Sequence, residues 1–499
     1  DLRVLRQVKQ FRFIMRGTAR SLRRSAPQDD ADGVKNNLKE AFLKNRFLVM
    51  VLGMGLLFSF LTGNGFPQDL RWDMAKADDD AKILSQKERH DVFNSWLEWR
   101  LDNIIPHLMK REGIDMWIIM NYEYGEDPVY LSMVTRPNMN ARRLSILIFH
   151  MRDDGFHKLT ANWHGIHSSG QFYEPLEFDR SKGERGQWEA LSAYINKHDP
   201  DKIGINESEH WVAFGNGLTA GLKDKFVRSL DAEYEKRLVS AEYLCVGWLE
   251  TRSPEQISVY RHIVGIGHDI IADFFSNKVI TPDITTTDEV VWWIRDRMCQ
   301  LGLEPWFQPS IRIMRSPADK AKYGEGDQVI RRGDILHCDV GFIYLGLCTD
   351  QQHNAYVCRE GETDAPAGVK ELLRKGNRLQ EIFLKEFKMG RTGTEVLLAS
   401  LAQGREEDLN PRIYTHPIGV HGHAAGTVLG RTDRQDGVPV RGDYPLHSNT
   451  VYSIELSVGH NIPEWDGELV TMGLEEEAVF TENGAFWLDG YPRTYYLIK

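Results

Sequence analysis

Cysteine is scarce in this chain of 499 residues. The five cysteines form no C-x-x-C pair, and an odd number gives no disulfide framework. The sequence also has no P-loop and no G-x-G-x-x-G stretch, so no glycine-rich phosphate-binding loop is expected. It contains no internal repeat, and we therefore do not expect a repeat protein. The cysteines are Cys245, Cys299, Cys338, Cys348 and Cys358.

A net positive charge is found only at the beginning of the chain. Residues 1–46 hold twelve Lys and Arg against five Asp and Glu, a net charge of +7, whereas the whole chain carries −11. The remainder therefore carries −18, and this acidic body excludes a nucleic-acid-binding protein. A hydrophobic content of 41% and a charged content of 27% are typical of a globular protein, here with two to four domains.

Long hydrophobic runs are absent except for one. Residues 47–68 contain no charge, and Phe47–Leu61 is almost wholly apolar. After the basic leader 1–46, this pattern predicts a signal peptide or signal anchor over 47–66, followed by a linker over 67–88. The charge asymmetry then predicts export to the periplasm or the cell exterior, with a membrane anchor if the segment is not cleaved. The alternative is a buried core helix.

Two aspartates, Asp339 and Asp350, lie on a predicted β-hairpin. The runs Ile335–Gly341 and Leu347–Val357 alternate and are rich in β-branched and aromatic residues, as strands are. A turn centred on residues 344–345 would place the two aspartates directly opposite each other, where like charges destabilise a sheet. A fold tolerates such a pair when a cation lies between the carboxylates or when one carboxyl stays protonated. We expect that a cation lies between the two carboxylates.

Further candidate metal ligands follow downstream. Residues 415–423 form a glycine-containing stretch with three histidines, Glu455 interrupts an apolar strand, and Glu475–Glu477 leads into another strand. A charge inside a half-buried strand is costly unless it is paired or coordinated. Together with the aspartates, these residues make a mixed nitrogen and oxygen set that suits two divalent ions such as Mn²⁺, Fe²⁺, Co²⁺ or Zn²⁺. The histidines are His416, His421 and His423.

The order of these residues resembles that of the pita-bread metallohydrolases, which include aminopeptidase P, prolidase, methionine aminopeptidase and creatinase. The resemblance runs from about Arg252 to the C-terminus, and the region from about His90 is similar to the N-terminal domain of aminopeptidase P, prolidase and creatinase. Glu476 is the alternative to Glu475 if the strand register slips by one residue. The metal ligands that the resemblance implies are Asp339, Asp350, His416, Glu455 and Glu475.

The resemblance also implies an activity. A hydroxide shared by two divalent ions, with manganese as the first expectation before zinc, cobalt or iron, would attack a carbonyl group. His423, seven residues after His416, is expected to bind the developing oxyanion, and Glu455 to pass a proton to the leaving amine. The substrate would be a peptide cut near its N-terminus, often at Xaa-Pro, or a small amide. A homodimer is expected from the family.

Several positions depart from the family pattern. Arg412 stands where the family has a further histidine, the loop 316–326 lacks a histidine found in aminopeptidase P-like enzymes, and Met472-Gly473 replaces an arginine. Arg412 and His421 are candidate substrate-binding residues, Arg412 through a bidentate contact with a carboxylate. His353 is a candidate partner that orients a ligand. The alternatives are therefore a lyase or an amidinohydrolase on the same scaffold, and a catalytically silent binding protein.

Two folded domains are predicted. Helical and strand patterns alternate through 89–246, which predicts an α/β domain, and the resemblance implies a creatinase-like one. Amphipathic helices are expected over Pro254–Phe275, Thr286–Leu301 and Val369–Glu386, with strands between and after them. This order is compatible with an α+β fold, and the resemblance implies a pita-bread domain over 247–499, in which helices cover a curved antiparallel sheet.

Overall fold

The computed structural model describes residues 83–164 and 170–499. The basic leader 1–46 and the hydrophobic segment 47–66 lie outside these residues, as does most of the linker 67–88. The predictions made for these segments are therefore not tested. Among the residues that the structure does describe, no helix combines the length and the apolar character needed to cross a membrane.

The described chain begins with a long helix, α3 (Gln86–Glu112). Ser85 is its N-cap and forms a capping box with Glu88, so the first turn has partners for its unpaired N–H groups. Gly113 closes the helix in the left-handed conformation with φ 62°, which glycine adopts without steric cost. Residues 86–88, the last of the predicted linker, belong to this helix.

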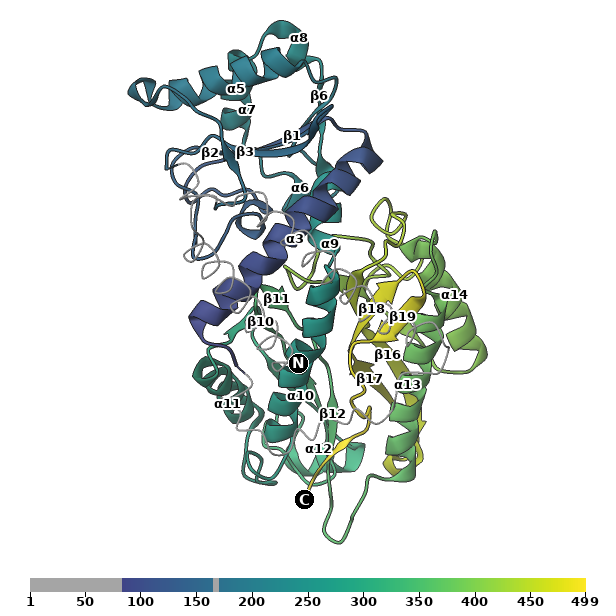
Figure 1. Ribbon diagram of the computed structural model, residues 1–499. Coiled ribbons are helices and arrows are strands. Elements are labelled where there is room, and N and C mark those ends of the chain that lie inside the picture. The colour runs from purple at the N-terminus through teal and green to yellow at the C-terminus, as the bar shows by residue number, and fades with distance from the viewer. Residues whose placement is uncertain (1–82, 165–169) are drawn as a thin grey trace, which may run out of the picture. The chain divides into compact units, whose positions relative to one another are not determined.

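The N-terminal part of the described chain is a six-stranded mixed sheet in the order β4-β3-β2-β1-β5-β6 (Figure 1). Strand β1 (Met116–Asn121) is buried on both faces: Trp117 and Ile119 pack with α3 and α9, whereas Met116 and Ile118 pack with α5 and α7. This explains its unbroken apolar sequence, since alternate residues point to opposite faces. The other elements of this part are β2 (Ser145–Arg152), β3 (Gly155–Thr160), β4 (Glu174–Pro175), α5 (Glu184–His198), β5 (Ile203–Ile205), α6 (Val212–Gly215), α7 (Ala220–Ser229), α8 (Ala232–Glu235), β6 (Leu238–Ser240) and α9 (Glu242–Glu250).

The C-terminal part builds two three-stranded and two four-stranded sheets from residues within 304–498. Nearly all of its strand pairs are antiparallel; β12 and β20 are parallel. Its elements are α10 (Pro254–Phe274), α11 (Thr287–Gln300), β7 (Glu304–Pro305), β8 (Ser310–Met314), α12 (Pro317–Tyr323), β9 (Ile335–Asp339), β10 (Phe342–Tyr344), β11 (Leu347–Cys348), β12 (Asn354–Val357), α13 (Ala367–Glu386), α14 (Gly393–Glu406), β13 (Arg412–Ile413), β14 (His416–Ile418), β15 (Thr450–Ser453), β16 (Leu456–Ile462), β17 (Glu468–Leu474), β18 (Glu477–Thr481), β19 (Gly484–Trp487) and β20 (Tyr496–Ile498).

Helices cover these sheets, as Figure 1 shows for α13 and α14 beside β16 to β19. The apolar face of α13 recurs at helical spacing, and Leu372, Leu379 and Phe383 pack against Val458 and Met472 of the sheet. The predicted combination of an α/β N-terminal part and an α+β C-terminal part is confirmed. The three helices predicted after residue 253 form with nearly the expected ends.

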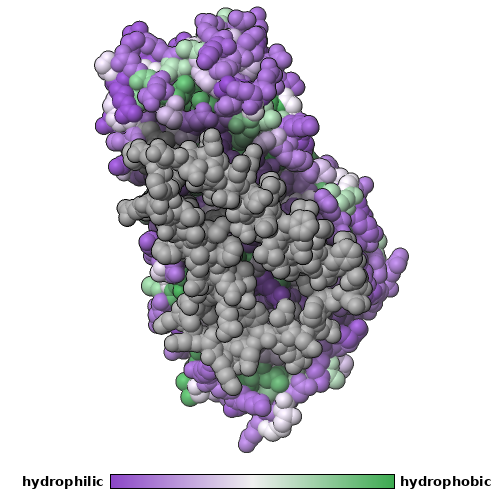
Figure 2. Space-filling model, in the orientation of Figure 1, coloured by the Kyte–Doolittle hydropathy of each residue, from purple (hydrophilic) through white to green (hydrophobic). Residues whose placement is uncertain are grey.

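The visible surface of the described residues is mostly polar. In the view of Figure 2, the visible described side chains are mainly hydrophilic, with smaller hydrophobic patches between them.

Candidate metal centre

The hairpin that carries Asp339 and Asp350 turns one residue later than predicted. Leu345 and Gly346 form the turn, with φ 56° and 74°, as a two-residue type I′ turn requires. The predicted pairing of the two aspartates is therefore wrong, since this register aligns Asp339 with Gln352. The error is two positions along the partner strand, so Asp350 still faces the same side of the hairpin and lies diagonally across from Asp339.

The other three candidate ligands come from the neighbouring strands. His416 begins β14 and pairs with Ser453 of β15. Glu455 lies between β15 and β16, and Glu475 lies between β17 and β18. An isolated bridge between Gln352 and Glu475 joins the hairpin to these strands. The topology thus brings residues that are up to 136 positions apart onto one surface of the sheets, counting from Asp339 to Glu475.

The five residues predicted from the sequence converge. Asp339, Asp350 and Glu475 present oxygens within 4.8 Å of one another, and so do the ligand atoms of His416, Glu455 and Glu475. Burial raises the pKa of Asp339 to about 6 and that of Glu455 to about 7. Burial, followed by the neighbouring carboxylates, raises the pKa of Asp350 and of Glu475 well above their ordinary values. Four carboxyl groups so close together require a proton or a cation among them.

The donor atoms of this cluster suit divalent metal ions. The Nδ1 atom of His416 donates to the carbonyl of Pro417 at 3.0 Å, so its Nε2 carries the lone pair. That Nε2 has no hydrogen-bond partner, although it lies 3.6 Å from Asp350 Oδ2 and 3.8 Å from Glu475 Oε1. Asp339 Oδ1 is likewise buried and unpartnered. Burying a polar atom without a partner costs free energy, and a bound ion would remove that cost. The residues present therefore fit metal binding.

Two supporting residues were missed by the sequence analysis. The amide nitrogen of Gln352 donates to Glu455 at 2.8 Å and to Glu475 at 2.7 Å, and its oxygen lies 2.9 Å from the His337 ring. The hydroxyl of Ser453 donates to Glu475. Groups that hold ligand carboxylates in this way orient the site. Their only sequence signal is strand alternation, because Gln352 and Asp350 share a face.

The structure also places the remaining histidines. His423 is exposed, and its ring centroid lies 4.7 Å from that of His416 with the planes at 89°. Trp306 contacts the other edge of His423 at 5.3 Å. His421 packs against Phe214 at 5.3 Å and is not part of the carboxylate cluster. His423 is therefore the histidine that a substrate could reach beside the candidate ligands.

Two arginines differ in their relation to the cluster. Arg412 is exposed on β13, and its guanidinium donates to the carbonyl of Thr432. Arg312, which the sequence analysis did not single out, is exposed on β8, and its charge lowers the pKa of both Asp339 and Glu455 against the effect of burial. The arginine that influences the candidate centre is thus Arg312.

The structure distinguishes Glu475 from Glu476, the alternative ligand if the strand register slips by one residue. Glu475 belongs to the carboxylate cluster, whereas Glu476 contacts His268 and His353. Neighbouring residues of an extended segment point to opposite faces, so both glutamates are used, in different surroundings. His353, predicted to orient a ligand, belongs to this second group.

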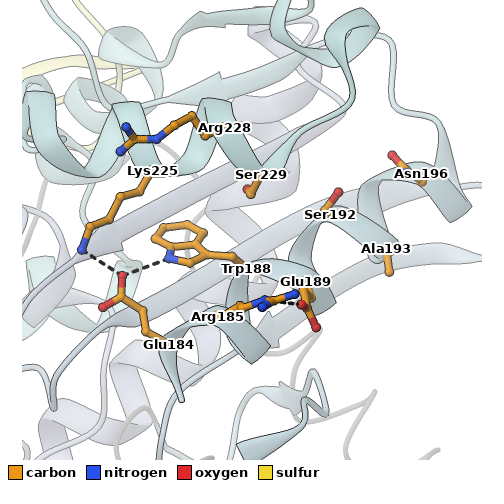
Figure 3. Close-up of a pocket in the computed structure, with 10 residues that line it drawn as sticks. All are labelled: Glu184, Arg185, Trp188, Glu189, Ser192, Ala193, Asn196, Lys225, Arg228 and Ser229. Carbon is orange, nitrogen blue, oxygen red and sulfur yellow. Dashed lines mark hydrogen bonds and ion pairs between the residues drawn. The ribbon is translucent and has the colours of Figure 1, made fainter. Parts of the chain in front are cut away.

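A surface hollow in the N-terminal part does not carry comparable chemistry. Figure 3 shows it between α5 and α7, lined by Trp188 and several charged side chains. Its Glu184 accepts hydrogen bonds from Lys225 at 3.0 Å and from the Trp188 indole at 3.0 Å. Because Lys225 is paired with Glu184 and Arg185 with Glu189, we assign no catalytic site here.

Comparisons with known proteins agree with this geometry. The solved structures similar to this chain include X-Pro aminopeptidase from Thermotoga maritima MSB8, with 19% identity, a TM-score of 0.54, and coverage of 78% of this chain and 99% of that one. Xaa-Pro dipeptidase from Bacillus anthracis has 14% identity, a TM-score of 0.51, and coverage of 80% and 99%. A dipeptidase from Pyrococcus horikoshii OT3 has 16% identity, a TM-score of 0.52, and coverage of 80% and 100%.

At these identities the solved structures show a shared fold. A search of curated proteins found no match. The sequence profile of metallopeptidase family M24 matches residues 258–483, the region that contains the whole carboxylate and histidine cluster. The pita-bread resemblance is thereby confirmed: residues 258–483 of this chain match the model of metallopeptidase family M24.

Proposed function

We propose that this chain is a metal-dependent peptidase with two divalent ions, manganese first among them, held by the five clustered residues. The observation that carries the proposal is the convergence of four carboxylates and one imidazole with unpartnered buried atoms. When bound, two such ions supply Lewis-acid activation of a carbonyl group and a water of lowered pKa. The residues are Asp339, Asp350, His416, Glu455 and Glu475.

The side chains around the cluster have separate tasks in this proposal. His423 lies exposed beside His416 and donates a hydrogen bond to the oxygen that gains negative charge. Glu455 is half-buried and held by Gln352, and it carries a proton to the leaving amine. Trp306 limits the movement of His423 by packing against its ring.

We further propose that the substrate is a short peptide with proline in the second position. The support is the activity for which two structural neighbours are named, X-Pro aminopeptidase and Xaa-Pro dipeptidase. Arg312 is a candidate for binding the C-terminal carboxylate of a dipeptide, because it is exposed and its charge acts on Asp339 and Glu455. Arg412 remains a second candidate from the sequence alone.

Hydrolysis of matched peptides tests this function. The full chain with Mn²⁺ is expected to cleave Gly-Pro and Ala-Pro peptides faster than the corresponding Gly-Ala and Ala-Ala peptides. Glu455→Gln is expected to lower kcat by 10²-fold or more, since general acid–base groups contribute about 10² to 10⁴. Glu482→Gln, in an exposed turn, is the matched control. A chain that binds manganese but cleaves none of these peptides would favour the lyase or amidinohydrolase alternative.

Export and dimer formation stay predictions from the sequence and the family. Residues 47–66 would direct the chain out of the cytoplasm, and cell fractionation with an antibody against the C-terminal part measures this. Recovery of the chain in the cytoplasmic fraction alone would contradict export.

Light scattering of the purified chain measures the mass of the expected homodimer.

A further inference from the structure

A second cluster of metal-binding side chains lies on the opposite face of the same strands. His268 of α10, His353 before β12 and Glu476 between β17 and β18 bring their ligand atoms within 4.8 Å of one another. Asp489, which follows β19, contacts His268 of this group. His353 and Glu476 are the direct sequence neighbours of Gln352 and Glu475, so strand alternation puts the two clusters back to back.

The distances suit a tetrahedral ion. His353 Nε2 lies 2.9 Å from Glu476 Oε1, His268 Nε2 lies 3.4 Å from Glu476 Oε2, and His268 Nε2 lies 3.2 Å from Asp489 Oδ2. Ligand atoms at about 2.0 to 2.1 Å from a zinc ion are about 3.3 to 3.4 Å apart when their arrangement is tetrahedral. The two contacts of His268 are close to that separation, and the contact between His353 and Glu476 is shorter.

The orientation of the side chains separates this arrangement from an ordinary buried ion pair. His353 Nε2 and Glu476 Oε1 are within hydrogen-bonding distance, yet neither atom has a hydrogen-bond partner in acceptable geometry. His268 Nε2 is also without one, and its side chain is fully buried. A buried polar atom without a hydrogen-bond partner calls for an explanation, and an ion bound between these side chains would supply one.

Charge and packing support the same reading. Without an ion, Glu476 and Asp489 raise the pKa of His268 to about 10 against the effect of burial, so the cluster holds a proton. A divalent cation would replace that proton, and its charge would be balanced by two carboxylates beside two neutral imidazoles. The ring of Tyr491 stacks on His268 at a centroid distance of 4.0 Å and an angle of 5°, which fixes the plane of that imidazole. Asp489 is 18% exposed and gives the cluster its contact with solvent.

We propose that His268, His353, Glu476 and Asp489 bind a third divalent metal ion of the zinc type, separate from the two of the proposed function. The donor set of two imidazoles and two carboxylates favours a borderline ion such as Zn²⁺. The ion would join helix α10 to the strands and to the segment after β19, behind the candidate catalytic face. It would act on structure, since none of its ligands belongs to the first cluster.

Metal counting on the full chain tests this proposal. After chelation, loading with Zn²⁺ alone and gel filtration, the wild type is expected to retain three ions per chain. His268→Ala is expected to retain two, and Asp350→Asn, which disrupts the first cluster, is expected to retain one. His262→Ala, on the same helix and outside the cluster, is the matched control and is expected to retain three.

The outcomes distinguish this proposal from the proposed function. Two ions in the wild type that persist in His268→Ala and disappear in Asp350→Asn would overturn the third site and leave the function intact. One ion that disappears only in His268→Ala would support the third site and overturn the dinuclear centre. If His268→Ala does not fold, the partly exposed Asp489→Ala replaces it, with the same expected loss of one ion.

X-ray absorption of the zinc-loaded Asp350→Asn chain gives a second measurement. The remaining ion is expected to show four nitrogen and oxygen ligands, two of them imidazoles. A spectrum without imidazole scattering would overturn the assignment.

Discussion

The protein around Asp350 does not by itself stabilise the charged carboxylate of this residue. It is 4% exposed, and burial together with Asp339, Glu455 and Glu477 raises its pKa. The hydrogen bond that binds this segment to Glu477 comes from the Asp350 backbone N–H, at 2.9 Å, and does nothing for the Asp350 carboxylate. A residue of this kind is retained where a bound cation offsets the cost of burying its charge.

Gln352 is expected to tune the affinity of the centre for metal. Replacement by Ala removes the amide that holds both Glu455 and Glu475, so the carboxylates lose their fixed orientation. We expect Gln352→Ala to weaken manganese binding about 10- to 100-fold. The manganese dependence of peptide hydrolysis measures this. Gln403→Ala on α14, whose amide bonds only Glu407, should leave that dependence unchanged.

Arg312 is expected to distinguish dipeptides from longer peptides. A charge-assisted hydrogen bond to the substrate carboxylate contributes about 1.5 to 3 kcal/mol, so Arg312→Gln should raise KM for Gly-Pro about 10- to 100-fold. The KM for a longer Xaa-Pro peptide, whose carboxylate lies elsewhere, should change little. Arg412→Gln serves as the comparison. The opposite result, with only Arg412→Gln affecting dipeptides, would restore the assignment made from the sequence.

Glu250 makes the stability of the chain depend on pH. Burial raises its pKa to about 8, and Tyr444 donates to it at 2.8 Å. Between about pH 4.5, the unfolded value, and pH 8, the folded chain keeps a proton that the unfolded chain loses, so stability falls as pH rises through this window. Glu250→Gln removes this loss, on the order of 3 kcal/mol. We expect the Tm of Glu250→Gln to exceed that of the wild type at pH 7.5 but not at pH 4.5; equal Tm values at both would contradict the prediction.

At the scale of elements, the sequence predicts the positions of helices better than the register in which strands pair. Capping boxes and helical spacing located α10, α11 and α13 within a few residues, because these signals are local. The hairpin turn was misplaced by one residue because Leu345 adopts a positive φ, which a leucine rarely does. Since side chains alternate along a strand, the resulting two-residue error in pairing kept Asp350 on the correct face.

Some residues of the candidate site could be predicted from the sequence, and others could not. The five clustered residues could be predicted because their order and spacing carry the family pattern. Whether Glu475 or Glu476 joins them depends on strand register, which the local sequence does not specify. Gln352, Trp306 and Arg312 could not be predicted, because their contacts form only when β8, the hairpin and the loop after β14 come together.

The loop after β14 is expected to depend on the absence of a side chain at Gly422. A Cβ there would lie 2.3 Å from the Trp306 ring. Because Trp306 also donates to the Thr349 carbonyl at 2.7 Å, it cannot move without disturbing the hairpin. Gly422→Ala should cost about 1 to 3 kcal/mol of stability and lower kcat by displacing His423. Gly326→Ala, where a Cβ meets nothing within 4 Å, is the control for thermal unfolding and activity.

At the scale of the whole molecule, the four carboxylates of the centre oppose folding until an ion is bound. Asp350→Asn removes one of these charges while keeping the size of the side chain. At pH 7.5 without metal, this variant should therefore be more stable than the wild type, since the folded wild type pays for burying a carboxylate whose pKa is raised. With saturating ion, the wild type gains stability by mass action and the variant does not.

The most direct test of the proposed centre is therefore Tm at pH 7.5, measured for the wild type and Asp350→Asn in EDTA and in Mn²⁺. The account predicts a crossing: the variant unfolds at the higher temperature in EDTA, and the wild type does so in Mn²⁺. A wild type whose Tm does not rise on addition of Mn²⁺, or a variant whose Tm rises as much, would contradict a metal centre at these residues.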